Sequence, residues 1–279
     1  MQPVAGGTRA PTAGSRSESA GLLNADQHRL LALRLYDAAR DGEAQTPLSD
    51  EFSQLETTDS YAIQGLLVAQ HDGQATGYKL GFTSAAMRKQ MGVDEPNYGV
   101  LLADTRVEQQ TRFGQFIHPR LEPEIALVTG VELSGTDALL ETVAAAVSTV
   151  HPAMEIVDSR FQEYRFRSVD NIADNSSAAG YCLGLGVAPA TIDALDSIEC
   201  HLYRDGVEIG AGRGEDAMGG PVQAVQWLVR KLAETGQTLA AGSVILTGGL
   251  TRAEIISTGD QFRVEFSGGL GNLDLTFAD

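Results

Sequence analysis

The stretch Leu121-Glu122-Pro123-Glu124-Ile125-Ala126-Leu127-Val128 predicts a buried β-strand and, with it, the class of fold. Side chains two residues apart on a strand point the same way, so Glu122 and Glu124 share one face. Apolar residues follow on both faces, which is typical of a strand inside a sheet, so the two carboxylates are expected at the mouth of a buried strand. Pro123 cannot donate a ladder hydrogen bond and predicts an edge or a bulge there.

A second apolar stretch, Pro152-Ala153-Met154-Glu155-Ile156-Val157, carries a lone carboxylate at Glu155. Carboxylates are seldom buried without a partner. If Glu155 meets the first two glutamates, each pair of like charges ~5 Å apart costs roughly 3 kcal/mol at an effective dielectric near 20. Such a cluster needs a cation, and ligation by oxygen alone suits Mg²⁺ or Mn²⁺. In the alternative interpretation, the first two glutamates lie on the surface and Glu155 pairs with Arg120 or Arg160.

Around these two strands the chain has the pattern of an α+β protein. Residues 1–23 are rich in small and polar residues and predict a disordered tail, and 24–76 predict a small helical N-terminal part. Residues 77–279 predict one β-rich domain. Strands are expected at 77–82, 98–102, 122–128, 153–158, 179–185, 198–204, 243–247, 261–266 and 270–277. Helices are expected from Asn24 or Asp26, and at 58–73, 84–91, 137–147 and 221–234.

Composition restricts the class of partner. The 279 residues carry a formal net charge of −17, which argues against binding to nucleic acid or to an anionic membrane surface. An acidic substrate would need a local positive centre, which a bound metal ion would supply. Cys182 and Cys200 do not form a C-x-x-C motif and are expected to be reduced thiols. Neither a secretory signal nor a long apolar run is apparent, so a cytoplasmic location is expected.

Three further segments carry polar groups that suit catalysis. Lys79 lies between two glycines in the strand 77–82, where it could bind a carboxylate or exchange a proton; the alternative is an edge lysine that reaches solvent. The cluster 174–177 could present hydroxyl and amide groups to a substrate or simply form a turn. Backbone N–H groups of the segment 247–249 could bind a carboxylate, although a plain turn explains them equally well.

These motifs together resemble the 2-oxopent-4-enoate hydratase / 4-oxalocrotonate decarboxylase family, a branch of the fumarylacetoacetate-hydrolase-like superfamily. The resemblance extends over most of the chain from about residue 25, and several long motifs occur in the expected order. The motifs are GYKLGFTS (77–84), YGVL (98–101), HPRLEPEIA (118–126), EIVDSR (155–160) and ADNSS (173–177).

The resemblance implies a mixed-sheet catalytic domain with Mg²⁺ or Mn²⁺ on the residues that match Glu122, Glu124 and Glu155. It also implies active-site roles for the residues that match Lys79, Asp104 and Ser177, although Asn-Ser-Ser at 175–177 departs from the more usual Asn-Ala-Ser. Substrate contacts are expected from Arg160, Thr247 and Gly248.

The implied reaction is metal-dependent decarboxylation of 2-oxohex-3-enedioate (4-oxalocrotonate) to 2-hydroxypenta-2,4-dienoate, in the meta-cleavage degradation of aromatic compounds. The segments 88–92, 118–120, 159–166 and 247–251 look more like the decarboxylase branch, because hydratases often carry a tryptophan after the Ser-Arg pair. Hydration of 2-hydroxypenta-2,4-dienoate is the alternative, and an acylpyruvate-type C–C hydrolase or a non-catalytic partner subunit is less expected. A homo-oligomer is expected, with possible association with a pathway hydratase or decarboxylase.

Overall fold

The computed structural model describes residues 23–279. The predicted tail lies outside the described residues except for Leu23, which is buried and donates its backbone N–H to Asp59. Asn24 then starts the first helix, because its side chain accepts hydrogen bonds from the backbone of Asp26 and Gln27, while Gln27 bonds back to Asn24. The helices are α1 (Ala25–Asp41), α2 (Leu48–Glu51), α3 (Thr57–Val68), α4 (Ala85–Met91), α5 (Leu140–Ala146), α6 (Ser168–Ala173) and α7 (Pro221–Ala233).

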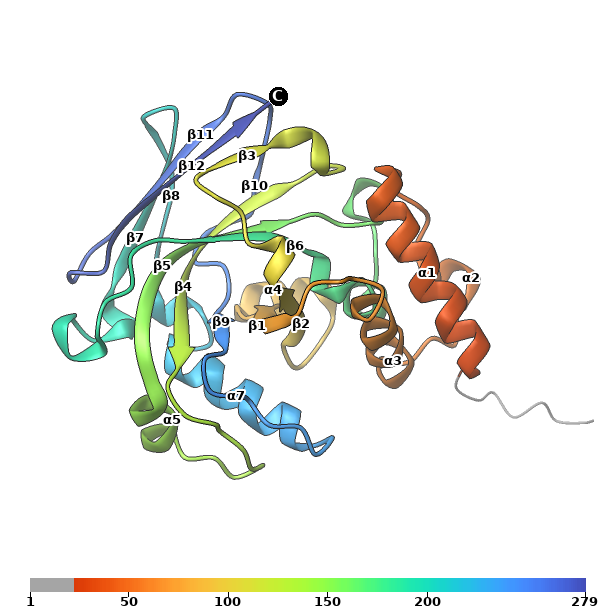
Figure 1. Cartoon of the computed structure of the whole chain (residues 1–279), viewed down its shortest axis with the longest axis horizontal. Helices are drawn as coiled ribbons and strands as arrows, with labels where there is room; N and C mark the ends of the chain where they lie inside the picture. Colours follow the sequence, from red (N-terminus) through yellow and green to blue (C-terminus); the bar gives the residue numbers. More distant parts are fainter. Residues whose placement is uncertain (1–22) are drawn as a thin grey trace, which may run out of the picture.

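The strands form two mixed sheets that curl against each other (Figure 1). The seven-stranded sheet has the order β2-β1-β9-β4-β5-β6, with β10 also paired to β4, and the five-stranded sheet has the order β3-β12-β11-β7-β8. In the first sheet the strands are β1 (Ala75–Gly81), β2 (Asn97–Leu102), β4 (Arg120–Thr129), β5 (Val147–Val157), β6 (Ala178–Leu183), β9 (Val244–Leu246) and β10 (Glu254–Ile255). In the second they are β3 (Gln110–Arg112), β7 (Glu199–Arg204), β8 (Val207–Arg213), β11 (Gln261–Phe266) and β12 (Gly271–Ala278).

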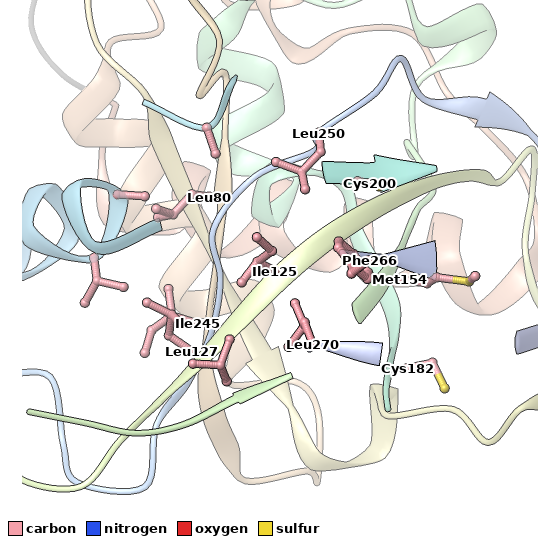
Figure 2. Packing of buried hydrophobic residues seen from close by; sticks show 14 of the residues in the cluster. Leu80, Ile125, Leu127, Met154, Cys182, Cys200, Ile245, Leu250, Phe266 and Leu270 are labelled. Atoms are coloured by element: carbon pink, nitrogen blue, oxygen red, sulfur yellow. The ribbon is translucent and has the colours of Figure 1, made fainter. Parts of the chain in front are cut away.

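The main hydrophobic core lies between the two sheets and under α7 (Figure 2). Alternate residues of β11 and β12 are buried, so each of these strands turns one apolar face toward the first sheet. Side chains from both sheets meet there, including those of Leu80, Ile125, Met154, Cys200, Ile245 and Phe266.

Helices α1 to α3 lie on the side of the molecule opposite to β7, β8, β11 and β12 (Figure 1). Their apolar residues, such as Leu31, Leu35 and Ile63, form a second core cluster. This cluster also contains Phe161 and Val169, which come from the chain after β5. The helical N-terminal part is therefore packed onto the segment that follows the second carboxylate strand.

The expected α+β fold with mixed sheets is confirmed, and every expected strand is present. The strand expected at 153–158 is longer, since β5 begins at Val147. Three strands were missed: β3 and β10 are very short, and glycines obscure the alternation in β8. The Asp205-Gly206 turn before β8, in which both residues have positive φ, is a hairpin signal that could have revealed it.

One short strand creates the opening in which the site forms. Strand β9 ends at Leu246, whose neighbours in the ladders are Lys79 of β1 and Ala126 of β4. Past this point no strand fills the space between β1 and β4 within the described chain. Glu124 lies two residues from Ala126 on that open side, and Pro123 occupies the gap between the β9 and β10 pairings. Pro123 is thus tolerated inside the sheet because that stretch of β4 lacks a ladder partner on one side.

Candidate active site

The structure brings Glu122, Glu124 and Glu155 together. Glu122 lies directly opposite Glu155 in the antiparallel β4–β5 ladder, and Glu124 follows two residues later on the same face. One carboxylate oxygen from each of the three lies within 4.8 Å of the others. Glu124 and Glu155 are fully buried, whereas Glu122 is partly exposed to the neighbouring cavity.

Several oxygens of these carboxylates lack a hydrogen-bond donor among the described residues. Among residues 23–279, Glu124 Oε1 and both carboxylate oxygens of Glu155 accept no hydrogen bond. Burial, followed by repulsion from Glu155, raises the pKa of Glu122 to about 7. Burial also raises the pKa of Glu124 and of Glu155. Three converging carboxylates with unused lone pairs fit a hard divalent cation such as Mg²⁺ or Mn²⁺.

Lys79 is the cation that the protein itself provides. Its Nζ lies 3.0 Å from Glu155 Oε1 and donates a 3.0 Å hydrogen bond to the carbonyl oxygen of Ser176. Lys79 is only 3% exposed, so the interpretation as a solvent-reaching edge lysine is wrong. Burial lowers its pKa, but the carboxylates of Glu155, Glu122 and Glu124 outweigh this effect and the pKa is raised. The alternative interpretation, in which Glu155 pairs with Arg120 or Arg160, is also wrong.

The glycines on either side of Lys79 make room for neighbouring protein atoms. Close approach by a ligand was one of the two expectations for glycines in this strand. A Cβ at Gly77 would lie 1.8 Å from the carbonyl oxygen of Val244 in β9. A Cβ at Gly81 would lie 2.3 Å from Asn97 Oδ1. Both glycines are needed because backbone or buried side chains approach β1 closely on this side.

The polar cluster after α6 forms a strained loop that borders the site. Asn175, Ser176 and Ser177 have φ values of 50, 54 and 57°, a left-handed conformation that non-glycine residues rarely adopt. Hydrogen bonds hold it there: Ser176 Oγ donates to Asn97 Oδ1, Asn97 Nδ2 to Asn171 Oδ1, and Asn171 Nδ2 to Ser177 Oγ. The loop brings the Ser177 hydroxyl to the same cavity as Lys79.

This cavity has a volume of about 230 Å³. It is lined by polar and aromatic groups that include Lys79, Glu122, Ser177, Arg120, Asn171 and Tyr164. Asn97, Asn171, Arg120 and Tyr164 were not among the predicted site residues. An asparagine in the first position of a strand, as at Asn97, was the available signal for a buried polar role.

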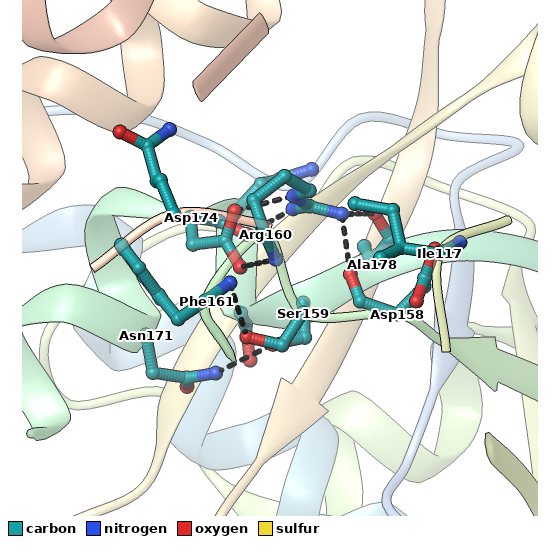
Figure 3. A network of polar contacts seen from close by, with 12 residues as sticks. Ile117, Asp158, Ser159, Arg160, Phe161, Asn171, Asp174 and Ala178 are labelled. Carbon is teal, nitrogen blue, oxygen red and sulfur yellow. Dashed lines mark hydrogen bonds and ion pairs between the residues drawn. The ribbon is translucent and has the colours of Figure 1, made fainter. Parts of the chain in front are cut away.

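Arg160 does not contribute to this cavity. It is buried and its guanidinium is committed: Nε pairs with Asp174, Nη1 donates to the carbonyl oxygens of Asp158 and Ala178, and Nη2 donates to the carbonyl of Asp174 (Figure 3). These contacts give no support to the expected binding of substrate by Arg160, which stays a prediction. Arg160 ties the strained loop to the end of β5.

Asp104 also lies elsewhere. It belongs to a short 3₁₀ turn (Ala103–Thr105) after β2 and is exposed on a different cavity, of about 470 Å³, beside α1 and α3. Lys79 pairs with Gly99 in the β1–β2 ladder, so about five residues of chain, or roughly 15 Å if extended, separate its position from Asp104. The structure thus places Asp104 away from the cavity of Lys79 and Ser177, and the active-site role that the resemblance implies for it stays a prediction.

Thr247 and Gly248 support the carboxylates from behind. Thr247 Oγ1 donates to the carbonyl oxygen of Ile125 at 2.7 Å, and the Gly248 N–H donates to Glu124 Oε2 at 2.7 Å. Neither residue lines the cavity, whereas the neighbouring Gly249 does. The turn does bind a carboxylate through its backbone, as one interpretation expected, but the carboxylate is that of Glu124. The substrate contacts expected from Thr247 and Gly248 stay a prediction.

The chain is similar to known proteins over most of its length. Residues 84–278 match the family model described as fumarylacetoacetate (FAA) hydrolase C-terminal. A TodF product hydratase of Pseudomonas putida strain F1 is 35% identical over 253 residues, covering 88% of this chain and 92% of that protein. A 4-oxalocrotonate decarboxylase from Pseudomonas sp. is 35% identical over 251 residues, covering 88% and 96%. The solved structure of 4-oxalocrotonate decarboxylase from Pseudomonas putida G7, complexed with magnesium and adipate, superposes with a TM-score of 0.89 at 30% identity, covering 91% of this chain and 98% of that one.

The chain thus belongs to the fumarylacetoacetate hydrolase family, and within it to the group of 2-oxopent-4-enoate hydratases and 4-oxalocrotonate decarboxylases. Both activities in this group are lyase activities. No helix among the described residues is long and apolar enough to cross a membrane.

Proposed function

We propose that this protein is a Mg²⁺- or Mn²⁺-dependent lyase that decarboxylates 2-oxohex-3-enedioate to 2-hydroxypenta-2,4-dienoate. The observation that carries the proposal is the convergence of Glu122, Glu124 and Glu155, with unused oxygen lone pairs, beside the buried ammonium of Lys79. A divalent ion held by these carboxylates would supply a Lewis acid for the carboxylate and 2-oxo oxygens of the substrate.

The reaction requires that the C5–C6 bond breaks and that C6 leaves as CO₂. The electron pair forms the C4=C5 double bond, the C3=C4 pair moves to C2–C3, and the 2-oxo oxygen takes the negative charge. Lys79, as an ammonium ion, is the group that would stabilise this oxygen and give it a proton to form the dienol. Ser177 and Asn171 would orient the substrate through their hydroxyl and amide groups, since both line the cavity.

A cavity of about 230 Å³ suits a small acid, because sites for drug-sized ligands span roughly 300–1,000 Å³. The likeness to the decarboxylase structure over 91% of this chain supports decarboxylation. Hydration of 2-hydroxypenta-2,4-dienoate is the second candidate, since relatives named hydratases are equally similar in sequence. Association with a pathway hydratase or decarboxylase, and a homo-oligomeric state, are part of the same proposal.

The choice between the two reactions can be tested directly. The purified protein with Mg²⁺ or Mn²⁺ is offered 2-oxohex-3-enedioate and, separately, 2-hydroxypenta-2,4-dienoate, and CO₂ release and dienol absorbance are followed together. We expect faster CO₂ release from the diacid than loss of the dienol. Rapid loss of the dienol without CO₂ release from the diacid would make the protein a hydratase.

A further inference from the structure

Arg120 is a cation that forms no ion pair with any carboxylate of residues 23–279. It is the first residue of β4, half-buried, and lines the cavity that contains Lys79 and Glu122. Within residues 23–279 its guanidinium makes no hydrogen bond and no ion pair. The other arginine of the lining, the exposed Arg252, reaches Glu254.

Tyr164 holds the Arg120 side chain in place. The guanidinium carbon lies 4.0 Å from the centre of the Tyr164 ring, a cation–π contact. The Tyr164 hydroxyl donates to the carbonyl oxygen of Val157, which is the residue opposite Arg120 in the β4–β5 ladder. Glu163 and Tyr164 both have left-handed backbone, with φ values of 57 and 56°, a strained conformation that concentrates at functional sites.

Stacking on an aromatic ring covers the face of a guanidinium and leaves its N–H edge free to bind a carboxylate through two parallel hydrogen bonds. No carboxylate of the described protein occupies that edge. Arg120 is two residues from Glu122 on the same face of β4, a spacing of roughly 7 Å. This is of the order of the distance between the two ends of an extended six-carbon diacid.

We propose that Arg120, positioned by Tyr164, is the specificity-determining residue that recognises the distal carboxylate of a dicarboxylate substrate. The inference rests on the proposed function, because it takes the glutamate cluster as the place where the 2-oxo acid end binds. A monocarboxylate would leave the Arg120 edge without an acceptor, and an unpaired polar group in a binding site penalises the analogue that fails to pair with it.

The role of Arg120 has a kinetic signature. A salt bridge to the leaving carboxylate stabilises the bound substrate but is lost as C6 becomes neutral CO₂. Arg120 is therefore expected to act mainly on KM: in Arg120→Gln the KM for the diacid rises, while kcat stays the same or increases.

The sharpest test compares two ligands that differ only in the distal group, 2-oxohexanedioate and 2-oxohexanoate. Their affinities are measured by calorimetry in the presence of Mg²⁺ for the wild type, Arg120→Gln, Arg120→Lys and the control Arg112→Gln, which changes an exposed arginine of β3. A charge-assisted hydrogen bond contributes enough that its loss weakens binding at least about 10-fold. We expect that loss for the diacid in Arg120→Gln, a smaller loss in Arg120→Lys, and a change of less than about 3-fold for the monoacid.

The two proposals fail in different ways. Equal weakening of both ligands in Arg120→Gln, or no weakening of the diacid, overturns the role of Arg120 even if the enzyme is a decarboxylase. If instead neither ligand binds the wild type more tightly with Mg²⁺ than without it, the metal-dependent function is wrong. Titration with Mg²⁺ alone and thermal unfolding establish that Arg120→Gln is folded, and Arg120→Lys provides the same comparison if it is not.

Discussion

Replacing Glu124 with glutamine should stabilise the metal-free protein, although most substitutions of buried residues destabilise. Glu124 lies within 4.8 Å of carboxylate oxygens of both Glu122 and Glu155. At that distance and an effective dielectric near 20, each repulsion is about 3.5 kcal/mol when both groups are charged. Partial protonation and the loss of attraction to Lys79 reduce the gain, so we expect about 2 kcal/mol at pH 8. Glutamine keeps an oxygen that can accept the Gly248 N–H hydrogen bond.

The assay is thermal unfolding at pH 8 in a chelator and in excess Mg²⁺. In the chelator, Glu124→Gln should unfold at least about 4 °C above the wild type, given the size of the protein. Mg²⁺ at 100 times its Kd should add about 2.7 kcal/mol to the unfolding free energy of the wild type and so raise its Tm. The Tm of the variant should not change with Mg²⁺. Glu132→Gln, an exposed position in a loop, serves as the control. A metal-free variant less stable than the wild type, or one that still responds fully to Mg²⁺, would refute the reasoning.

Three further outcomes are expected. Lys79→Met should lower the rate at least about 100-fold while Mg²⁺ still binds. It should also destabilise the protein more in chelator than in Mg²⁺, because Glu155 loses its only cationic partner among the described residues. Turnover within a few-fold of the wild type would reduce Lys79 to a structural role. The stability of the metal-free protein should fall as pH rises from about 4.5 through 7, because the raised pKa of Glu122 means that the folded protein holds this proton more tightly than the unfolded chain does. The loss of unfolding free energy should reach up to about 3 kcal/mol, measured by urea titration at pH 5 and pH 8, and Glu122→Gln should make it smaller. Deleting residues 1–19 should leave both Tm and turnover unchanged, and a loss of either would mean that the tail contacts the enzyme.

Much of this site could be predicted because strand periodicity is a local property. The alternation at Glu122 and Glu124 places both on one face whatever the rest of the fold does, and the apolar residues around Glu155 mark a second buried strand. That Glu122 lies opposite Glu155 depends on the β4–β5 register, which is set by pairing over the whole length of both strands. The sequence alone therefore predicted the cluster only on the condition that the two strands bring Glu155 to the first two glutamates.

The site predictions that the structure does not support concern residues whose surroundings depend on long-range partners. Arg160 has a side chain of the kind that binds acidic substrates, but Asp174 and three backbone carbonyls occupy its guanidinium. Asp104 is close to the matching motif in sequence, yet it lies past the end of β2 and on another cavity. As a single side chain Arg120 was considered as a partner for Glu155, because the sequence gives no sign that Lys79 takes that place. Which cation pairs with which carboxylate is decided by tertiary distance.

The short strand β9 connects the fold to the chemistry. A longer β9 would fill the space between β1 and β4, pair the backbone near Glu124, and close the opening to Lys79. Because β9 stops at Leu246, the following turn instead directs the Gly248 N–H to Glu124, and the sheet interior becomes accessible. The carboxylates are thereby buried enough to raise their pKa values, while Glu122 remains in contact with the cavity. The interruption in the sheet thus places charge in a low-dielectric interior that is still open to the cavity.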